Sequence, residues 1–143
     1  MSRTIRDVAL LLSLFAVVGD AQTSSPPQLA IPGVIGARTA VELIRGGFQG
    51  LEGPVATLDG GLYFSDVPAS RSYKLDMNGI ISIWRENTNG ANGSFLFKDG
   101  RLLAAEQTGR RIVSVTPDGR VTPLASQFDG QPFRSPNDLI PDS

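Results

Sequence analysis

The sequence contains no cysteine and no histidine among its 143 residues. Without cysteine there is no disulfide framework and no thiolate metal site, and without histidine the usual general base and the usual zinc ligand are missing. A Ser-His-Asp or Cys-His mechanism is therefore excluded. Any metal must be held by carboxylates, amides and carbonyls, which favour a hard cation such as calcium or magnesium.

The sequence also lacks an excess of charge of either sign. The net charge is −1, and the 19% of residues that are charged are mixed in sign along the chain. Nucleic-acid binding requires a basic face that attracts the phosphate backbone, and this composition provides none. We therefore expect no nucleic-acid partner.

The longest apolar run is too short to cross a membrane. It extends over 11 residues from Val8 to Val18, follows Arg3 and Arg6, and precedes small residues at the −3 and −1 positions of a cleavage site after Ala21. A spanning helix needs about 20 apolar residues, so this pattern predicts a secretory signal peptide over residues 1–21. We expect a secreted or periplasmic protein with no membrane association beyond the signal peptide.

A flexible leader is predicted over residues 22–36, which include Ser-Ser-Pro-Pro. The remaining residues, 37–143, contain an internal repeat with a period of forty. The segment Asp59–Asp66 aligns with Asp99–Glu106, and Asn78-Gly79 aligns with Asp118-Gly119. A fixed period of this length is typical of repeat architectures.

Each repeat unit contains four short runs with β-branched or aromatic content, separated by turn residues. The predicted strands are 53–58, 62–66, 72–76 and 80–84 in the first unit, and 93–98, 102–106, 112–116 and 120–125 in the second. The turn pairs Asp59-Gly60, Asn78-Gly79, Asp99-Gly100 and Asp118-Gly119 stand where hairpins need a positive φ. Four antiparallel strands in about 40 residues form the blade of a β-propeller.

The predicted fold class is therefore an all-β, incomplete β-propeller, with blades at about 50–89 and 90–129. The forty-residue shift also places an outer strand of a further blade near Val41–Ile44, and a third blade begins after Arg134. A propeller needs at least four blades, so we expect the N-terminal part of a larger protein or a truncated product, with an exposed blade edge available to a partner. A single sandwich of eight or nine strands is the alternative.

Three polar residues are predicted to face one channel, because the first strand of each blade lines the centre of a propeller. Glu52 shifts by forty onto Asn92, and a five-residue insertion around Asp129–Arg134 brings Asn137 to the same position in the next unit. A carboxylate and two amides are oxygen ligands suited to a hard divalent cation. Alternatively, Glu52 is a solvated loop carboxylate, and the two asparagines belong to ordinary turns.

Acidic residues end the second strand of both units, and basic residues follow them. Asp66 and Glu106, with Arg71 and Arg111, are interpreted as structural pairs or turn contacts within the blade because they recur in each unit, with a ligand role as the alternative. Arg110 differs, since the residue forty positions earlier is Ser70. It is therefore a candidate for binding a substrate.

These motifs resemble the gluconolactonase and regucalcin (senescence marker protein) family of six-bladed β-propellers. The matching segments, in order, are Leu51–Pro54, Gly61–Asp66, Ala91–Gly93, Asp99–Leu103 with Glu106, and Ser135–Leu139. The resemblance implies a divalent metal, commonly calcium or zinc, held by a glutamate, an asparagine and an aspartate. The motif matches assign the glutamate to Glu52, the asparagine to Asn137 and a substrate-side asparagine to Asn92.

The function implied by the resemblance is metal-dependent hydrolysis of a small sugar lactone. The family's general-base aspartate belongs to a later blade, beyond the end of this chain, so the catalytic residue is unknown and the chain alone is expected to be incomplete as an enzyme. Calcium is the expected cofactor, with zinc or magnesium as alternatives. The competing interpretation is a non-catalytic propeller fragment, or a remnant that binds a sugar or a protein partner.

Overall fold

The computed structural model describes residues 30–34, 36 and 39–142. The signal peptide predicted at 1–21 and most of the leader predicted at 22–36 lie outside the described residues. The chain divides into two units, Met1–Glu42 and Leu43–Ser143. In the described part of the first unit, the Val34 amide donates to the Ile31 carbonyl at 2.8 Å and the Thr39 amide donates to the Gly36 carbonyl at 3.1 Å, as in turns. Among the described residues, no helix is long and apolar enough to cross a membrane.

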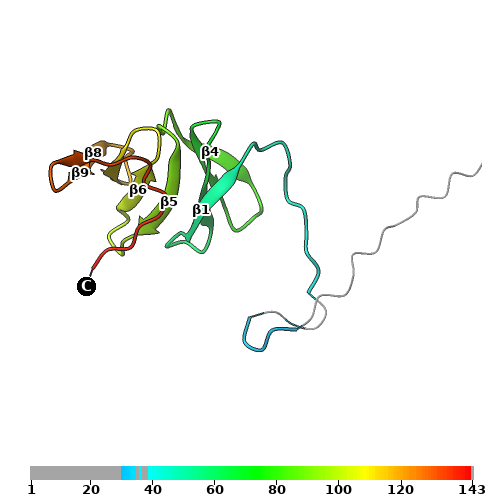
Figure 1. Ribbon diagram of the computed structural model, residues 1–143. Coiled ribbons are helices and arrows are strands. Elements are labelled where there is room, and N and C mark those ends of the chain that lie inside the picture. The colour runs from blue at the N-terminus through cyan, green and yellow to red at the C-terminus, as the bar shows by residue number, and fades with distance from the viewer. Residues whose placement is uncertain (1–29, 35, 37–38, 143) are drawn as a thin grey trace, which may run out of the picture. The chain divides into compact units, whose positions relative to one another are not determined.

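The second unit contains two four-stranded antiparallel sheets, each with its strands in chain order (Figure 1). The first sheet consists of β1 (Leu51–Ala56), β2 (Leu62–Asp66), β3 (Arg71–Leu75) and β4 (Ile81–Glu86). The second consists of β5 (Ala91–Leu96), β6 (Leu102–Glu106), β7 (Arg111–Val115) and β8 (Val121–Ala125). Each sheet is a propeller blade, and the innermost strands β1 and β5 lie side by side. The predicted incomplete propeller is confirmed.

The four turn pairs carry the backbone conformation that the sequence predicts. Gly60, Gly79, Gly100 and Gly119 have φ values of 87°, 80°, 84° and 85°. Glycine adopts these values without the steric cost that a Cβ atom imposes. In the turn between β3 and β4, the Asp76 carboxylate also accepts the amides of Asn78 and Ile80, both at 2.9 Å. Local turn chemistry therefore sets where each hairpin reverses.

The two innermost strands begin two residues earlier than predicted, because each contains a β-bulge. Pairing between β1 and β2 shifts between Glu52 and Val55, and pairing between β5 and β6 shifts between Ala91 and Ser94. A bulge adds a residue to one strand and bends it. Hydrogen-bonded pairing with the second strand of each blade therefore resumes before the bulge, at Leu51 and Glu52 in β1 and at Ala91 in β5.

The principal core lies between the two blades. In the second blade, Ala91, Leu102, Ala104, Val113 and Val115 are buried in one cluster. The first blade packs Val55, Tyr63 and Trp84 against this cluster. These residues alternate along their strands with residues of the opposite face, as a pleated sheet requires.

The outer strand predicted near Val41–Ile44 is wrong. These residues lie in irregular backbone, and the side chains of Val41, Leu43 and Ile44 are exposed. A β-strand forms only where a neighbouring strand accepts and donates its ladder hydrogen bonds, and the described residues contain no other strand of the further blade to which this segment was assigned.

The predicted insertion near residues 129–134 is a two-stranded hairpin, formed by β9 (Gln127–Phe128) and β10 (Gln131–Pro132). The third blade expected after Arg134 does not begin with a strand, since residues 133–142 are irregular. This segment nevertheless lies along β5, because the Gly93 amide donates to the Asn137 carbonyl at 2.7 Å.

Candidate metal and substrate site at the channel

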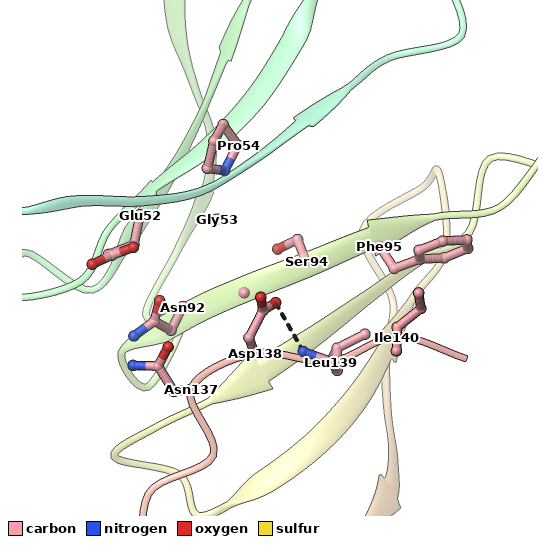
Figure 2. Close-up of a pocket in the computed structure, with 11 residues that line it drawn as sticks. Glu52, Gly53, Pro54, Asn92, Ser94, Phe95, Asn137, Asp138, Leu139 and Ile140 are labelled. Atoms are coloured by element: carbon pink, nitrogen blue, oxygen red, sulfur yellow. Dashed lines mark hydrogen bonds between the residues drawn. The ribbon is translucent and has the colours of Figure 1, made fainter. Parts of the chain in front are cut away.

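An open cavity of about 760 Å³ lies where β1, β5 and the segment after Arg134 come together. Glu52 lines it from β1, Asn92 from β5, and Asn137 and Asp138 from the C-terminal segment. Figure 2 shows the side chains of Glu52, Asn92 and Asn137 gathered at one end of this cavity. The structure thus brings together the three polar residues that the forty-residue shift selected.

Two glycines allow the backbones that carry these residues to approach. A Cβ atom at Gly53, whose φ is +58°, would lie 2.0 Å from the Asn92 carbonyl oxygen. A Cβ atom at Gly93 would lie 2.2 Å from the Asp138 Oδ1 atom and 2.8 Å from the Asn137 carbonyl oxygen. Neither position has room for a side chain. The sequence signal for this role is a glycine at the same position of both units, which the strand pattern alone does not distinguish from a turn residue.

The amide of Asn92 is held in a defined orientation. Its side chain is 4% exposed, and its Nδ2 atom donates to the Gln107 Oε1 atom at 3.3 Å. This bond uses one of the two N–H donors of the amide and leaves the amide oxygen for a ligand in the cavity. Gln107 was not predicted as a site residue, because nothing in its sequence position distinguishes it from a turn residue.

The donor set at the cavity fits a hard divalent cation. Glu52 supplies a carboxylate and Asn137 an amide oxygen at one end of the cavity, whereas the Asp138 carboxylate, whose Oδ1 atom accepts the Leu139 amide at 2.8 Å, lines the cavity farther along β5 (Figure 2). In the described part of the chain, no three His, Cys, Asp or Glu residues form a group that could hold a metal. A site here would therefore depend on amide and carbonyl oxygens, which suits calcium better than zinc.

Arg110 lies apart from this group. It stands in the turn between β6 and β7, is absent from the residues that line the cavity, and its Nε atom donates to the Phe133 carbonyl at 2.6 Å. Its substrate-binding role stays a prediction.

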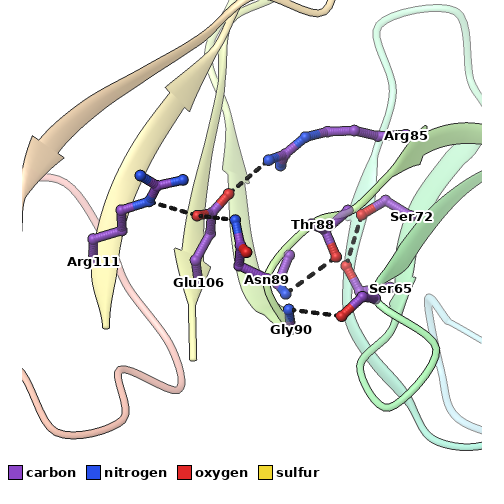
Figure 3. Close-up of polar contacts among 10 residues, drawn as sticks. Ser65, Ser72, Arg85, Thr88, Asn89, Gly90, Glu106 and Arg111 are labelled. Carbon is purple, nitrogen blue, oxygen red and sulfur yellow. Dashed lines mark hydrogen bonds and ion pairs between the residues drawn. The ribbon is translucent and has the colours of Figure 1, made fainter. Parts of the chain in front are cut away.

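A buried carboxylate joins the two blades near the site. Glu106 has no exposed surface, and its oxygens accept bonds from Arg85 Nη2 at 2.6 Å, Arg111 Nε at 2.7 Å and Asn89 Nδ2 at 3.2 Å (Figure 3). Arg85 belongs to β4 of the first blade, whereas Arg111 belongs to the same blade as Glu106. The ion pairs therefore fix the connection that leads to Asn92.

The structural interpretation of the acidic positions holds, with different partners from those expected. Arg111 pairs with Glu106, but Arg71 pairs with Glu86 at 3.2 Å instead of with Asp66. Asp66 accepts the backbone amides of residues 49 and 50, both at 3.0 Å. In both blades the acidic residue that ends the second strand fixes the chain just before an innermost strand.

A carboxylate with a lowered pKa, Asp59, belongs to a turn and not to the cavity. Hydrogen bonds from Lys74, at 2.5 Å, and from Thr57 lower the pKa of Asp59 to about 2. Asp59 follows the far end of β1, whereas Glu52 lies at the start of that strand. The pKa of Asp59 is therefore a property of the turn.

Comparison with known proteins decides the family. A family model described as the SMP-30/gluconolactonase/LRE-like region matches residues 51–143. The chain belongs to this family. The match includes both blades and all the cavity residues named above.

Solved structures agree with this membership. A protein provisionally described as a gluconolactonase is 31% identical, with a TM-score of 0.63, over 68% of this chain and 34% of that one. A gluconolactonase from Xanthomonas campestris is 26% identical, with a TM-score of 0.64, over 67% of this chain and 33% of that one. Catalytically inactive virginiamycin B lyase from Staphylococcus aureus, at 20% identity and a TM-score of 0.51, shares the fold. The chain spans about one third of the length of these structures, and no curated protein matches it.

Proposed function

We propose that this SMP-30/gluconolactonase-family chain forms part of the active site of a metal-dependent lactone hydrolase. One observation carries the proposal: Glu52, Asn92 and Asn137, from three successive positions of the repeat, surround one cavity. In a propeller, such residues converge on the channel from separate blades.

Glu52 and Asn137 are the proposed metal ligands, and Asn92 is the proposed substrate contact. The Glu52 carboxylate supplies the negative charge that a divalent cation needs, and the Asn137 amide supplies a neutral oxygen. The oxygen of the Asn92 amide accepts a hydrogen bond from a substrate hydroxyl, because the bond from Nδ2 to Gln107 fixes the orientation of the amide. The burial of Asn92, which is 4% exposed, restricts the movement of that side chain.

Calcium is the proposed cation, with magnesium or zinc as alternatives, in keeping with the divalent metal that the family generally uses. Bound there, the cation would polarise the lactone carbonyl towards attack by water. We assign the general base to none of Glu52, Asn92 and Asn137, so complete activity is proposed for the protein that carries these blades together with the remaining ones.

A small sugar lactone is the proposed substrate. The cavity volume of about 760 Å³ lies within the range of about 300–1,000 Å³ that small-molecule sites occupy. Its lining combines polar groups with apolar ones such as Pro54, Phe95 and Ile140. We also propose that the protein is exported, on the basis of the predicted signal peptide at 1–21.

Hydrolysis of gluconolactone by the protein that carries these blades together with the remaining ones, followed as proton release, tests the proposal. We expect a chelator to abolish the reaction, a divalent cation to restore it, and Glu52→Gln to lower the rate by about 100-fold or more. Glu86→Gln, in an exposed ion pair on the outer strand, is the matched control and leaves the rate unchanged. Hydrolysis that persists in the chelator contradicts the metal role, and sugar binding without hydrolysis supports a non-catalytic binding protein instead.

A further inference from the structure

Ser70 and Arg110 occupy the same position in the two blades and share a rare backbone conformation. Ser70 lies between β2 and β3 with a φ of 50°, and Arg110 lies between β6 and β7 with a φ of 55°. A residue with a side chain adopts this left-handed region at a steric cost. We propose that the residue at this position holds, by hydrogen bonds, the connection that leaves its own blade, and we call this arrangement the clamp. Arg110 is thereby the positioning residue for Asn137.

The first blade shows the clamp in its short form. The Ser70 carbonyl accepts the Thr88 amide at 3.0 Å, and the Ser70 Oγ atom accepts the Gly90 amide at 3.2 Å. Both amides belong to the connection between β4 and β5, and Asn92 follows Gly90 by two residues. Two hydrogen bonds accepted by one turn residue therefore fix the chain immediately before Asn92 enters the cavity (Thr88, Asn89 and Gly90 of this connection are labelled in Figure 3).

The second blade shows the same device over a longer distance. Its connection includes the hairpin β9–β10, whose base is closed by the Phe133 amide donating to the Ser126 carbonyl at 2.9 Å. Arg110 Nε donates to the carbonyl of that same Phe133 at 2.6 Å. A serine side chain ends one bond beyond Cβ, whereas arginine extends several bonds further. The longer side chain thus reaches the residue at which the hairpin ends.

The clamped segment leads directly to the site. Asn137 follows Phe133 by four residues, and its carbonyl accepts the Gly93 amide at 2.7 Å. That hydrogen bond seats the segment against β5. If the Arg110 side chain releases Phe133, the Asn137 carbonyl loses its fixed place beside Gly93, and the Asn137 side chain loses its place beside Glu52. The consequence of this release for cation binding by Asn137 and Glu52 rests on the proposed function.

The test uses Arg110→Gly and Arg110→Asn in the whole chain. Glycine and asparagine both accept a positive φ more readily than arginine, and neither reaches Phe133, so the variants remove the clamp without adding backbone strain. Arg71→Gln removes an exposed arginine from an ion pair on the other blade and is the control. The readouts are the thermal midpoint, the hydrogen-exchange rate of the Gly93 amide measured by NMR, and calcium affinity.

We expect both variants to keep or raise the thermal midpoint while the Gly93 amide exchanges about tenfold faster or more. Unchanged exchange at Gly93 overturns the proposal, and so does faster exchange spread over the core amides of β6 and β7, because that result indicates general destabilisation. For calcium, Arg110→Gly should weaken binding in the wild-type background and have no further effect beside Asn137→Leu. If Arg110→Gly lowers calcium affinity further in the Asn137→Leu variant, the proposal that the clamp acts through Asn137 is overturned. A chain that binds no calcium contradicts the proposed metal site, and the Gly93 readout then still tests the clamp.

Discussion

Replacing Glu106 by glutamine should destabilise the protein far more than any surface substitution of the same kind. Glu106 is fully buried, and its carboxylate accepts bonds from Arg85 and Arg111, whose side chains are 10% and 32% exposed. Glutamine keeps the volume but removes the charge. Two guanidinium groups then face a neutral amide that also presents hydrogen-bond donors to them.

The size of the effect follows from burial. Removing one partner of a buried ion pair costs about 3–5 kcal/mol, because the remaining charge stays desolvated without compensation. The exposed pair Arg71–Glu86, with side chains 46% and 55% exposed, is instead worth about 0–1 kcal/mol. Glu86→Gln is therefore the matched control. For a folded unit of this size, the difference of about 2–5 kcal/mol corresponds to a thermal midpoint that falls by roughly 8 °C or more beyond that of the control.

The assay is thermal or urea unfolding followed by tryptophan fluorescence. Trp84 is the single tryptophan of the sequence, packs against the core between the blades and adjoins Arg85, so it reports on the contact that Glu106 maintains. A loss of less than about 1 kcal/mol for Glu106→Gln, equal to that of Glu86→Gln, would refute the reasoning that this carboxylate joins the blades.

Two further predictions concern the backbone and the turns. Gly53→Ala should destabilise the protein by about 2–4 kcal/mol, since its Cβ would lie 2.0 Å from the Asn92 carbonyl oxygen. The control is Gly79→Ala, whose Cβ meets nothing within 4 Å and which should cost only the strain of its positive φ, about 1–2 kcal/mol. Equal losses of unfolding free energy in urea would contradict the close approach of β1 and β5. Because Lys74 and Thr57 lower the pKa of Asp59 from 3.8 to about 2, the stability that this carboxylate contributes is complete above about pH 4 and is lost as the pH falls towards 2. Unfolding midpoints between pH 5 and pH 2 should therefore fall less steeply for Asp59→Asn, and an identical acid dependence would contradict that assignment.

Much of the fold follows from local sequence chemistry. The Asp-Gly and Asn-Gly pairs require a positive φ at the glycine, and the forty-residue shift transfers each turn from one blade to the next. The predicted bounds of β2 and β6 coincide with those observed. The starts of β1 and β5 were missed by two residues, because a bulge depends on the partner strand and leaves no local pattern beyond a glycine.

The site was predictable only where it repeats. Glu52 and Asn92 are related by the forty-residue shift and Asn137 by that shift with the five-residue insertion, so repeat position predicted that all three line one cavity. The ion pair between Arg85 and Glu106 joins different blades. The residue forty positions after Arg85 is Ala125, so the repeat pattern does not predict this pair. Val41–Ile44 shows the converse error: the repeat pattern was present, but a strand also needs a neighbour.

Calcium binding to the wild-type chain and to Glu52→Gln tests the central claim most directly. A ligand that binds only the folded state raises the thermal midpoint, and above the dissociation constant the stabilisation grows with the logarithm of the ligand concentration. We predict that calcium raises the midpoint of the wild-type chain and that Glu52→Gln abolishes the rise, while the midpoint without calcium is unchanged. The same calcium response in both chains, or none in either, would contradict the assignment of Glu52 as a metal ligand at the channel.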